Sequence, residues 1–328
     1  MKEIRARSAM RIAGAFAIVA LVILAVGCGS KSKTSSTSGA KTTTVAGNIQ
    51  VTSDPSLYAG LPDNIKTAGV IKVASDIPYP PWEMFVTPTS KQATGFDYDL
   101  SQAIGAKIGI KASFNQTPFD GIILSIKSGK NDTIMSDMYD NAEREGQGVS
   151  FVDYANDGTS ILVPTGNPKG ITNLDSLAGQ TVACESGTTQ QVLLQNLNKQ
   201  FAASGKPAMT IKAVPNQPAA LLAVSSGTAV GDLTDHSTAE YIAKTEGAGN
   251  TFEVVADPAA PNGYEPQLVG IGIVSTNTQL IDTVQKALQA LIVDGTYKQI
   301  VDKYGLLPVS SAQVNQGGKP TSSPSTTP

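Results

Sequence analysis

Residues 95–136 read GFDYDLSQAIGAKIGIKASFNQTPFDGIILSIKSGKNDTIMS, a stretch in which helical and strand patterns alternate. Apolar residues spaced three and four apart predict two helices, over 97–109 and 119–128. Short β-type runs predict strands over 70–74, 112–116 and 132–136. Strands that alternate with helices in this way indicate an α/β fold with mostly parallel sheets.

The second half of the chain repeats the alternation. Predicted strands cover 181–184, 209–214, 229–234 and 268–274. Predicted helices cover 189–202, 217–226 and 278–304, the last in two pieces broken at Gly295. In open α/β sheets, ligands bind beyond the carboxyl ends of the strands. We therefore expect the functional side chains in the loops that follow these strands.

Length and charge narrow the classes of function. The chain has 328 residues, of which 41% are hydrophobic and 16% charged, which suffices for two lobes with packed cores. The formal net charge is −3. The first 27 residues hold four basic side chains and one acidic one, so the rest of the chain is more acidic still, at −6. Because nucleic-acid binding rewards clustered Lys and Arg, a nucleic-acid partner is not expected.

Scarce cysteine and histidine exclude other chemistries. Cys28 and Cys184 do not form a disulfide framework, and Cys184 is expected to be a small buried apolar residue. His236 is the single histidine, so no zinc ligand set exists, and a structural role is expected for it. We expect no metal, no cofactor and no catalytic residue.

The N-terminus has the features of an export signal. Residues 2–11 are basic, and residues 13–26 are an apolar run too short to span a bilayer. Ala25-Val26-Gly27-Cys28 resembles the lipobox of bacterial lipoproteins, although Ala25 stands where Leu is usual. The resemblance implies cleavage after residue 27, lipidation of Cys28 and anchoring at the extracytoplasmic face of the membrane. The alternative is a plain signal peptide with a chance cysteine.

Two polar segments flank the predicted body. Residues 29–47 are rich in Ser, Thr, Lys and Gly, a composition that predicts a flexible tether, which we extend over 28–54. Residues 310–328 have a similar composition and are predicted to be a disordered tail. The folded body is therefore expected over 55–309.

Eight short motifs occur in an order and spacing similar to one known family. They are Asp76-Ile-Pro-Tyr79-Pro-Pro-Trp82-Glu83, Gly95-Phe-Asp97-Tyr-Asp99-Leu100, Phe119-Asp120-Gly121, Ser128-Gly129-Lys-Asn-Asp132, Glu143-Arg144, Leu174-Asp-Ser-Leu177-Ala-Gly179, Gly187-Thr188-Thr189-Gln190 and Asp294-Gly-Thr-Tyr297-Lys298. Together they resemble bacterial extracellular solute-binding proteins of family 3, the polar amino-acid receptors of ABC importers. The resemblance implies a two-lobed, type II periplasmic-binding-protein-like clamshell with the ligand cleft between the lobes. Lobe 1 would cover 55–161 plus 258–309, and lobe 2 would cover 162–257.

An amino-acid ligand carries a carboxylate and an ammonium group, and burying either requires an opposite charge and hydrogen bonds. The resemblance assigns the ligand carboxylate to Arg144, whose guanidinium can bind it bidentately. It assigns the ammonium group to Asp235, with Asp76 as a second partner. The alternatives are a solvated Arg144 and an Asp235 that only caps a helix.

Further positions match ligand contacts of the family. Phe119 and Tyr79 match rings that contact the ligand side chain, whereas Trp82 is expected in the core. Thr188 and Thr189 open a predicted helix, where backbone N–H groups attract anions, although simple capping is the alternative.

Several residues depart from the family pattern and bear on the ligand. Ser136 is expected to contact the ligand, and Asp137, which follows it, stands where the family has Ser or Gly. Tyr139 replaces a usual Thr or Ser, and Glu185 ends a lobe 2 strand. Added carboxylates in a closed cleft favour a cationic side chain, so arginine, lysine or histidine is the predicted ligand. Asp137 paired with Arg144 is the competing interpretation.

The resemblance therefore implies a receptor, expected to be a monomer, that binds an amino acid and delivers it to an ABC permease without catalysis. Two alternatives stay open: a periplasmic dehydratase-type enzyme on the same fold, with Asp137 or Glu185 as general acid, and a ligand-sensing surface lipoprotein.

Overall fold

The structure, a computed structural model, describes residues 39–87 and 89–317. The predicted export signal, residues 1–27, and the predicted lipid-bearing Cys28 lie outside the described residues. None of the helices in the described part of the chain combines the length and the hydropathy that a membrane span requires.

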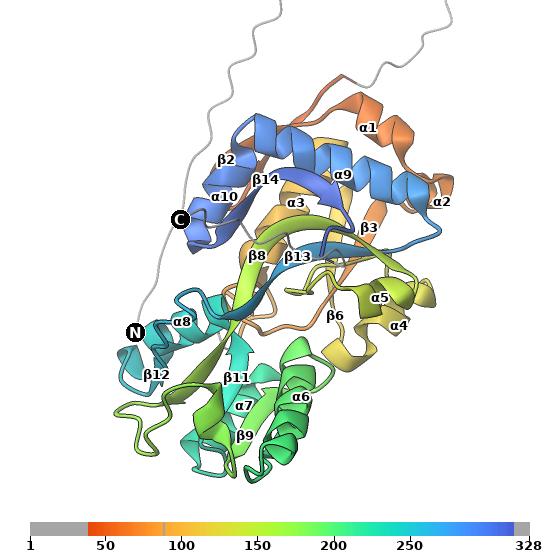
Figure 1. The fold of residues 1–328 in the computed structure, drawn as a ribbon. Coiled ribbons are helices and arrows are strands. Elements are labelled where there is room, and N and C mark those ends of the chain that lie inside the picture. The colour runs from red at the N-terminus through yellow and green to blue at the C-terminus, as the bar shows by residue number, and fades with distance from the viewer. Residues whose placement is uncertain (1–38, 88, 318–328) are drawn as a thin grey trace, which may run out of the picture. The chain divides into compact units, whose positions relative to one another are not determined.

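Helices and strands alternate through most of these residues (Figure 1). The α-helices are α1 (Pro55–Gly60), α2 (Asp63–Ala68), α3 (Phe96–Ile108), α4 (Ile122–Lys127), α5 (Ala142–Gly146), α6 (Thr189–Ala203), α7 (Gln217–Ser225), α8 (His236–Thr245), α9 (Thr278–Val293) and α10 (Thr296–Tyr304). The 3₁₀ turns are η1 (Phe119–Gly121), η2 (Leu174–Leu177) and η3 (Glu246–Ala248). The strands are β1 (Thr42–Val45), β2 (Ile49–Thr52), β3 (Val70–Ser75), β4 (Met84–Phe85), β5 (Ala93–Thr94), β6 (Lys111–Gln116), β7 (Thr133–Ile134), β8 (Val149–Pro164), β9 (Thr181–Glu185), β10 (Thr210–Val214), β11 (Gly231–Asp235), β12 (Phe252–Val254), β13 (Tyr264–Val274) and β14 (Leu307–Val314).

The long strand β8 connects two groups of strands. From Val149 to Asp157 it pairs antiparallel with β13, and β13 leads on to β7, β3 and β6. From Thr159 to Leu162 it pairs antiparallel with β11, which leads on to β9 and β10. Within each group the pairs β3–β6, β3–β7, β9–β10 and β9–β11 are parallel, as the alternation predicts. Figure 1 shows β8 and β13 running side by side between the two groups.

Each group of strands has its own hydrophobic core. On the side of β3, β6 and β7, Phe96, Leu100 and Leu288 are fully buried against the sheet. On the side of β9, β10 and β11, Leu194 and Leu233 belong to a separate buried cluster. The structure therefore has two lobes, lobe 1 around β3 and lobe 2 around β9, and the predicted type II clamshell is confirmed. The predicted residue limits of the lobes stay a prediction.

Glycines set the ends of the helices that shape lobe 1. Gly95 precedes α3 with a φ of 118°, and a Cβ there would lie 2.4 Å from the carbonyl oxygen of Trp82, so only glycine fits. Gly295 lies between α9 and α10 with a φ of 82°, which breaks the helical run at the predicted residue. Trp82 is fully buried in the core of lobe 1, as expected.

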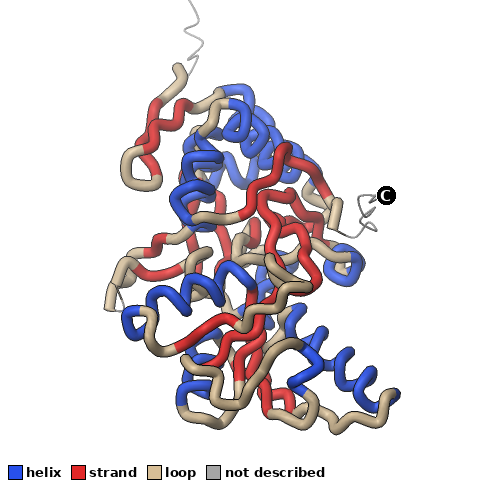
Figure 2. The backbone as a smooth tube through the Cα atoms, turned by 60° about the vertical axis from the view of Figure 1, so that its left-hand side comes forward, coloured by secondary structure: helices blue, strands red, loops and turns tan. Residues whose placement is uncertain are grey.

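The predicted tether is wrong for residues 42–52. These residues form a β1–β2 hairpin (Figure 2). Val45, Ile49 and Val51 of this hairpin are buried with the core of lobe 1. The threonine-rich composition resembles a linker, but threonine and valine also favour strands, and alternate residues of β2 face the core. The folded body therefore starts before residue 55.

The predicted disordered tail is likewise wrong where it overlaps β14, which continues to Val314 and pairs with β8. Ala312 is buried, and its N–H donates to Gln289 of α9. Asn315 accepts a hydrogen bond from the N–H of Phe151 at 2.7 Å. The polar side chains of this strand point outward, and its backbone is held by the edge of β8, which composition alone does not reveal.

Candidate ligand-binding pocket

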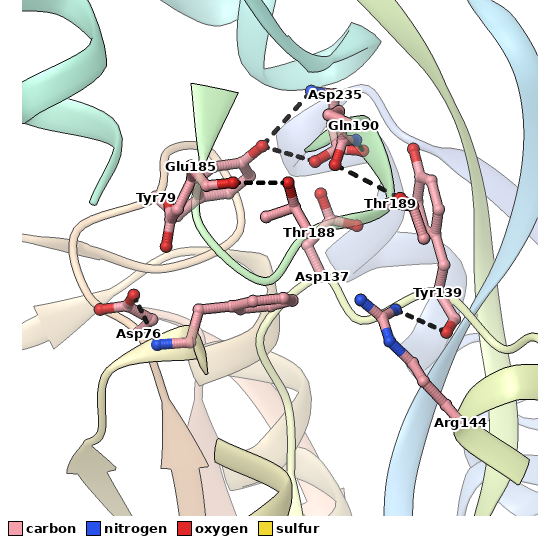
Figure 3. Close-up of a pocket in the computed structure, with 11 residues that line it drawn as sticks. Asp76, Tyr79, Asp137, Tyr139, Arg144, Glu185, Thr188, Thr189, Gln190 and Asp235 are labelled. Atoms are coloured by element: carbon pink, nitrogen blue, oxygen red, sulfur yellow. Dashed lines mark hydrogen bonds between the residues drawn. The ribbon is translucent and has the colours of Figure 1, made fainter. Parts of the chain in front are cut away.

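A pocket with about 310 Å³ of space not filled by atoms lies where strands of both lobes end. Figure 3 shows its lining. Its walls are formed by Asp76, Tyr79, Phe119, Asp137, Tyr139, Arg144, Glu185, Thr188, Thr189, Gln190 and Asp235. Ten of the eleven residues predicted to bind the ligand are therefore brought together, although their contact with a ligand stays a prediction.

Ser136 is the predicted residue that does not line the pocket. It is 2% exposed, and its hydroxyl donates to Glu83 at 2.6 Å and accepts the N–H of Asp76 at 2.9 Å. Ser136 therefore lies behind the pocket wall and holds the backbone of Asp76 in place.

Gln190 is the residue that the sequence interpretation did not single out. Its side-chain amide donates to Asp235 at 2.7 Å, and the residue is 3% exposed. It belongs to the quoted Gly187-Thr188-Thr189-Gln190 motif and lies in the first turn of α6. A buried polar side chain beside a helix start is the signal that could have identified it.

One end of the pocket carries the guanidinium of Arg144. Asn141 caps α5 by accepting the N–H of Arg144, and Nη1 of Arg144 donates to the carbonyl oxygen of Tyr139 at 2.8 Å. The guanidinium carbon lies 5.5 Å from the centre of the Phe119 ring. Figure 3 shows the group pointing into the pocket, and we expect the rest of its fork of N–H donors to be available there.

Arg144 stays charged although it is buried. Burial lowers its pKa to about 10, well above neutral pH. Within the described residues its guanidinium makes no ion pair at 4.0 Å or less, and the Asp137–Arg144 pair considered from the sequence does not form. A buried cation of this kind is suited to an anionic group of a ligand.

Asp235 ends β11 and faces the middle of the pocket. Its side chain does not cap α8; it accepts hydrogen bonds from Tyr79 at 2.5 Å and from Gln190 at 2.7 Å. Burial raises the pKa of Asp235, and these hydrogen bonds oppose the rise. Because Tyr79 belongs to lobe 1 and Asp235 to lobe 2, this contact joins the lobes across the pocket.

Asp137 has a left-handed backbone, with a φ of 42°, and its carboxyl group is buried. Among the described residues no N–H or O–H group donates to either of its oxygens. It lies close enough to the carboxyl group of Asp235 for each to affect the pKa of the other. Burial, followed by the charges of Asp235 and Asp157, raises the pKa of Asp137 well above its usual range, so one of the two carboxyl groups carries a proton.

The other end of the pocket is acidic. Asp76 accepts the N–H of Phe119 at 2.9 Å; burial raises the pKa of its carboxyl group, and the neighbouring Glu185 carboxyl opposes the rise. Burial, followed by the contact with Asp76, raises the pKa of Glu185 to about 10. Figure 3 shows Asp76 and Glu185 at the end of the pocket away from Arg144.

Thr188 and Thr189 place the start of α6 at the pocket. The Thr188 hydroxyl caps the helix by accepting the N–H of Gln191, and it donates to the carbonyl oxygen of Glu185. The capping interpretation therefore holds for this side chain. The first-turn N–H groups of α6 lie beside the pocket, where the helix dipole favours an anion.

Two residues outside the pocket match their expected roles. Cys184 is fully buried in the core of lobe 2. His236 is half-buried, its Nδ1 is hydrogen-bonded to Ser160, and burial lowers its pKa. Within the described residues no three His, Cys, Asp or Glu side chains are arranged to hold a metal ion.

Comparison with known proteins identifies a family match over most of the chain. The sequence profile of bacterial extracellular solute-binding proteins, family 3, matches residues 71–306. The putative ABC transporter arginine-binding protein 2 of Escherichia coli K12 is 28% identical over 248 residues, which cover 76% of this chain and 96% of that protein. The lysine/arginine/ornithine-binding periplasmic protein of the same organism is 28% identical over 255 residues, or 76% of this chain and 90% of that protein.

Among solved structures, one similar chain is an ancestral amino acid-binding protein described as a precursor of cyclohexadienyl dehydratase. It is 29% identical, has a TM-score of 0.60, and covers 74% of this chain and 98% of its own length. The curated relatives are thus binding proteins, and one structural neighbour precedes an enzyme.

Proposed function

Because the chain belongs to the bacterial extracellular solute-binding proteins, family 3, we propose that it is the receptor of an ABC importer for a basic amino acid. The observation that carries this proposal is the polarity of the pocket, which has a charged Arg144 at one end and the carboxyl groups of Asp76 and Glu185 at the other. Arg144 and the start of α6 would bind the ligand carboxylate, and Asp235 with Asp137 would bind the α-ammonium group.

The charge balance supports a cationic ligand side chain. Four carboxyl groups line the pocket against one guanidinium, and the acidic end lies opposite the proposed carboxylate site. A neutral side chain would leave these buried carboxyl groups without a positive partner. The names of the relatives point in the same direction, since those two bind arginine or lysine, arginine and ornithine.

Thermal unfolding of the purified protein against a panel of amino acids tests the proposal. A ligand present at one hundred times its dissociation constant stabilises the folded state by about 2.7 kcal/mol. For a protein of this size, we expect a rise of about 5 °C or more in Tm with arginine, lysine or histidine. A rise with glutamate or glutamine alone would contradict the basic ligand, and no rise with any amino acid would contradict the amino-acid receptor.

A dehydratase activity is the second candidate, because one structural neighbour precedes an enzyme and Glu185 is protonated at neutral pH. We propose binding without catalysis, since the pocket is lined by groups that would pair with each charge of a zwitterion. Product detection after incubation with cyclohexadienyl acids separates the two functions.

We also propose that the protein is held at the outer face of the membrane by lipid on Cys28, which rests on the export signal and the Ala25-Val26-Gly27-Cys28 segment alone. Metabolic labelling with a fatty-acid analogue should mark the protein, and Cys28→Ser should abolish the label. A label that survives in Cys28→Ser would contradict anchoring at this residue.

A further inference from the structure

Two carboxyl groups meet across the pocket, one from each lobe. Asp76 follows β3 in lobe 1. Its N–H donates a hydrogen bond to the Ser136 hydroxyl, and its carboxylate accepts one from the N–H of Phe119, so its position is fixed. Glu185 ends β9 in lobe 2, where its backbone is fixed by the Thr188 hydroxyl. Both side chains line the acidic end of the pocket (Figure 3), where their carboxyl groups lie close enough to affect each other's pKa.

Two neighbouring buried carboxyl groups retain a proton between them, because two ionised groups so close together would repel each other. The surroundings oppose the loss of that proton. Asp120 on η1 faces Asp76, and Asp232 and Asp235 on β11 face Glu185. None of the ion pairs in the described residues involves either group, and Arg144 lies at the other end of the pocket.

We infer that a cationic ligand side chain enters the acidic end in exchange for the proton shared by Asp76 and Glu185, so that binding of such a ligand releases a proton. The inference rests on the proposed function, because it assigns the ligand's side chain to this end of the pocket. A guanidinium or ammonium group between the two carboxylates supplies the positive charge that the proton otherwise supplies. Both lobes contribute to the exchange, so the cation also strengthens their contact.

The exchange distinguishes arginine from its neutral isostere citrulline. Both ligands present the same α-amino and α-carboxyl groups to Asp235 and Arg144, so any protons released there are common to both. Only arginine brings a charge to Asp76 and Glu185. Arginine should therefore release about one proton more than citrulline, and its affinity relative to citrulline should rise about tenfold per pH unit where the full proton is exchanged.

The direction of this pH dependence follows from the pair. Burial and the contact with Asp76 raise the pKa of Glu185 to about 10, so the proton is held at neutral pH when no cation faces it. A cation between the carboxylates lowers that pKa, because it favours their ionised forms. Binding is then weaker in acid and stronger as the pH rises, within about pH 5.5 to about pH 7, where neither the guanidinium nor the α-ammonium of arginine changes appreciably.

Isothermal titration calorimetry of the purified protein in two buffers of different ionisation enthalpy measures the protons released. We expect the extra proton with arginine for the wild-type protein and its loss in Glu185→Gln, whose amide replaces the protonated carboxyl. Glu240→Gln is the matched control, because Glu240 pairs with Lys244 outside the pocket. The control should release the proton as the wild type does.

Arginine binding without an extra proton would overturn the exchange and leave the proposed receptor function intact. An extra proton that persists in Glu185→Gln would also overturn it, because the proton would then come from another group. No binding of any amino acid would overturn the proposed function, and the inference with it. Asp76→Asn gives a second variant with the same expected loss.

Discussion

Arg144→Ala is expected to weaken amino-acid binding by about 100-fold or more. Arg144 is the proposed partner of the ligand carboxylate, and truncating one member of a buried, hydrogen-bonded charge pair costs about 2–5 kcal/mol. No other arginine follows residue 11, so no second guanidinium can take its place. Calorimetry or tryptophan fluorescence with the stabilising amino acid from the thermal panel measures the loss.

A charge-matched control separates binding from general destabilisation. Lys303 pairs with Asp99 at 2.6 Å in lobe 1 and does not line the pocket. Lys303→Ala removes one positive charge and should leave the affinity within a few-fold of the wild type. Arg144→Lys keeps the charge without the planar fork and should fall between the wild type and Arg144→Ala. Binding of Arg144→Ala within tenfold of the wild type would refute the assigned role.

Asp235→Asn should weaken binding by about 30-fold or more, because it removes the proposed charge partner of the ligand ammonium group. Without added ligand, the same substitution should leave the folding stability of the protein unchanged or raise it. Burial raises the pKa of Asp235, so its ionised form costs folding stability as the pH rises above the ordinary value of an aspartate. Asparagine keeps the shape and can still accept from Gln190. At neutral pH we therefore expect an unchanged or higher Tm.

Asp232→Asn is the control for this pair of effects. Asp232 lies on the same strand, is fully buried, accepts a hydrogen bond from Gln217, and burial raises its pKa to about 7. It lines no part of the pocket. Its replacement should change the affinity far less than Asp235→Asn does, while it removes a comparable buried carboxylate. Equal losses of affinity in Asp232→Asn and Asp235→Asn would show that the effect is not specific to the ammonium site.

The sequence predicted the fold and most of the pocket because both depend on local signals. The apolar spacing of α3 and the glycine between α9 and α10 placed those helices within one or two residues. Many pocket residues come soon after a strand, because several of the quoted motifs begin where a strand ends. The β1–β2 hairpin was missed because its threonines favour a linker and a strand alike, and only the packing of Val51 against lobe 1 decides between them.

The protonation of the Asp76 and Glu185 carboxyl groups could not be predicted from the sequence, for a different reason. Asp76 and Glu185 were both expected in the ligand cleft, but the sequence gives no sign that their carboxyl groups lie next to each other. Their contact arises only when lobe 2 faces lobe 1, and the contact, with burial, determines the charge state. Ser136 illustrates the same limit, since it was predicted to contact the ligand but its side chain turns away from the pocket toward Glu83.

The long strand β8 also has a consequence for how the chain folds. The elements β9 to β12 follow one another along the chain, whereas the sheet of lobe 1 is completed only by β13 and β14, which come after them. Gly272 pairs with Ile134, a contact that closes a loop containing all of β9 to β12. Pairings between residues far apart in the sequence form slowly. Lobe 2 can therefore assemble before β13 joins the sheet of β7 and β3. A chain that stops before Tyr264 would lack β13 and β14, and would carry a formed lobe 2 beside an open, aggregation-prone sheet edge.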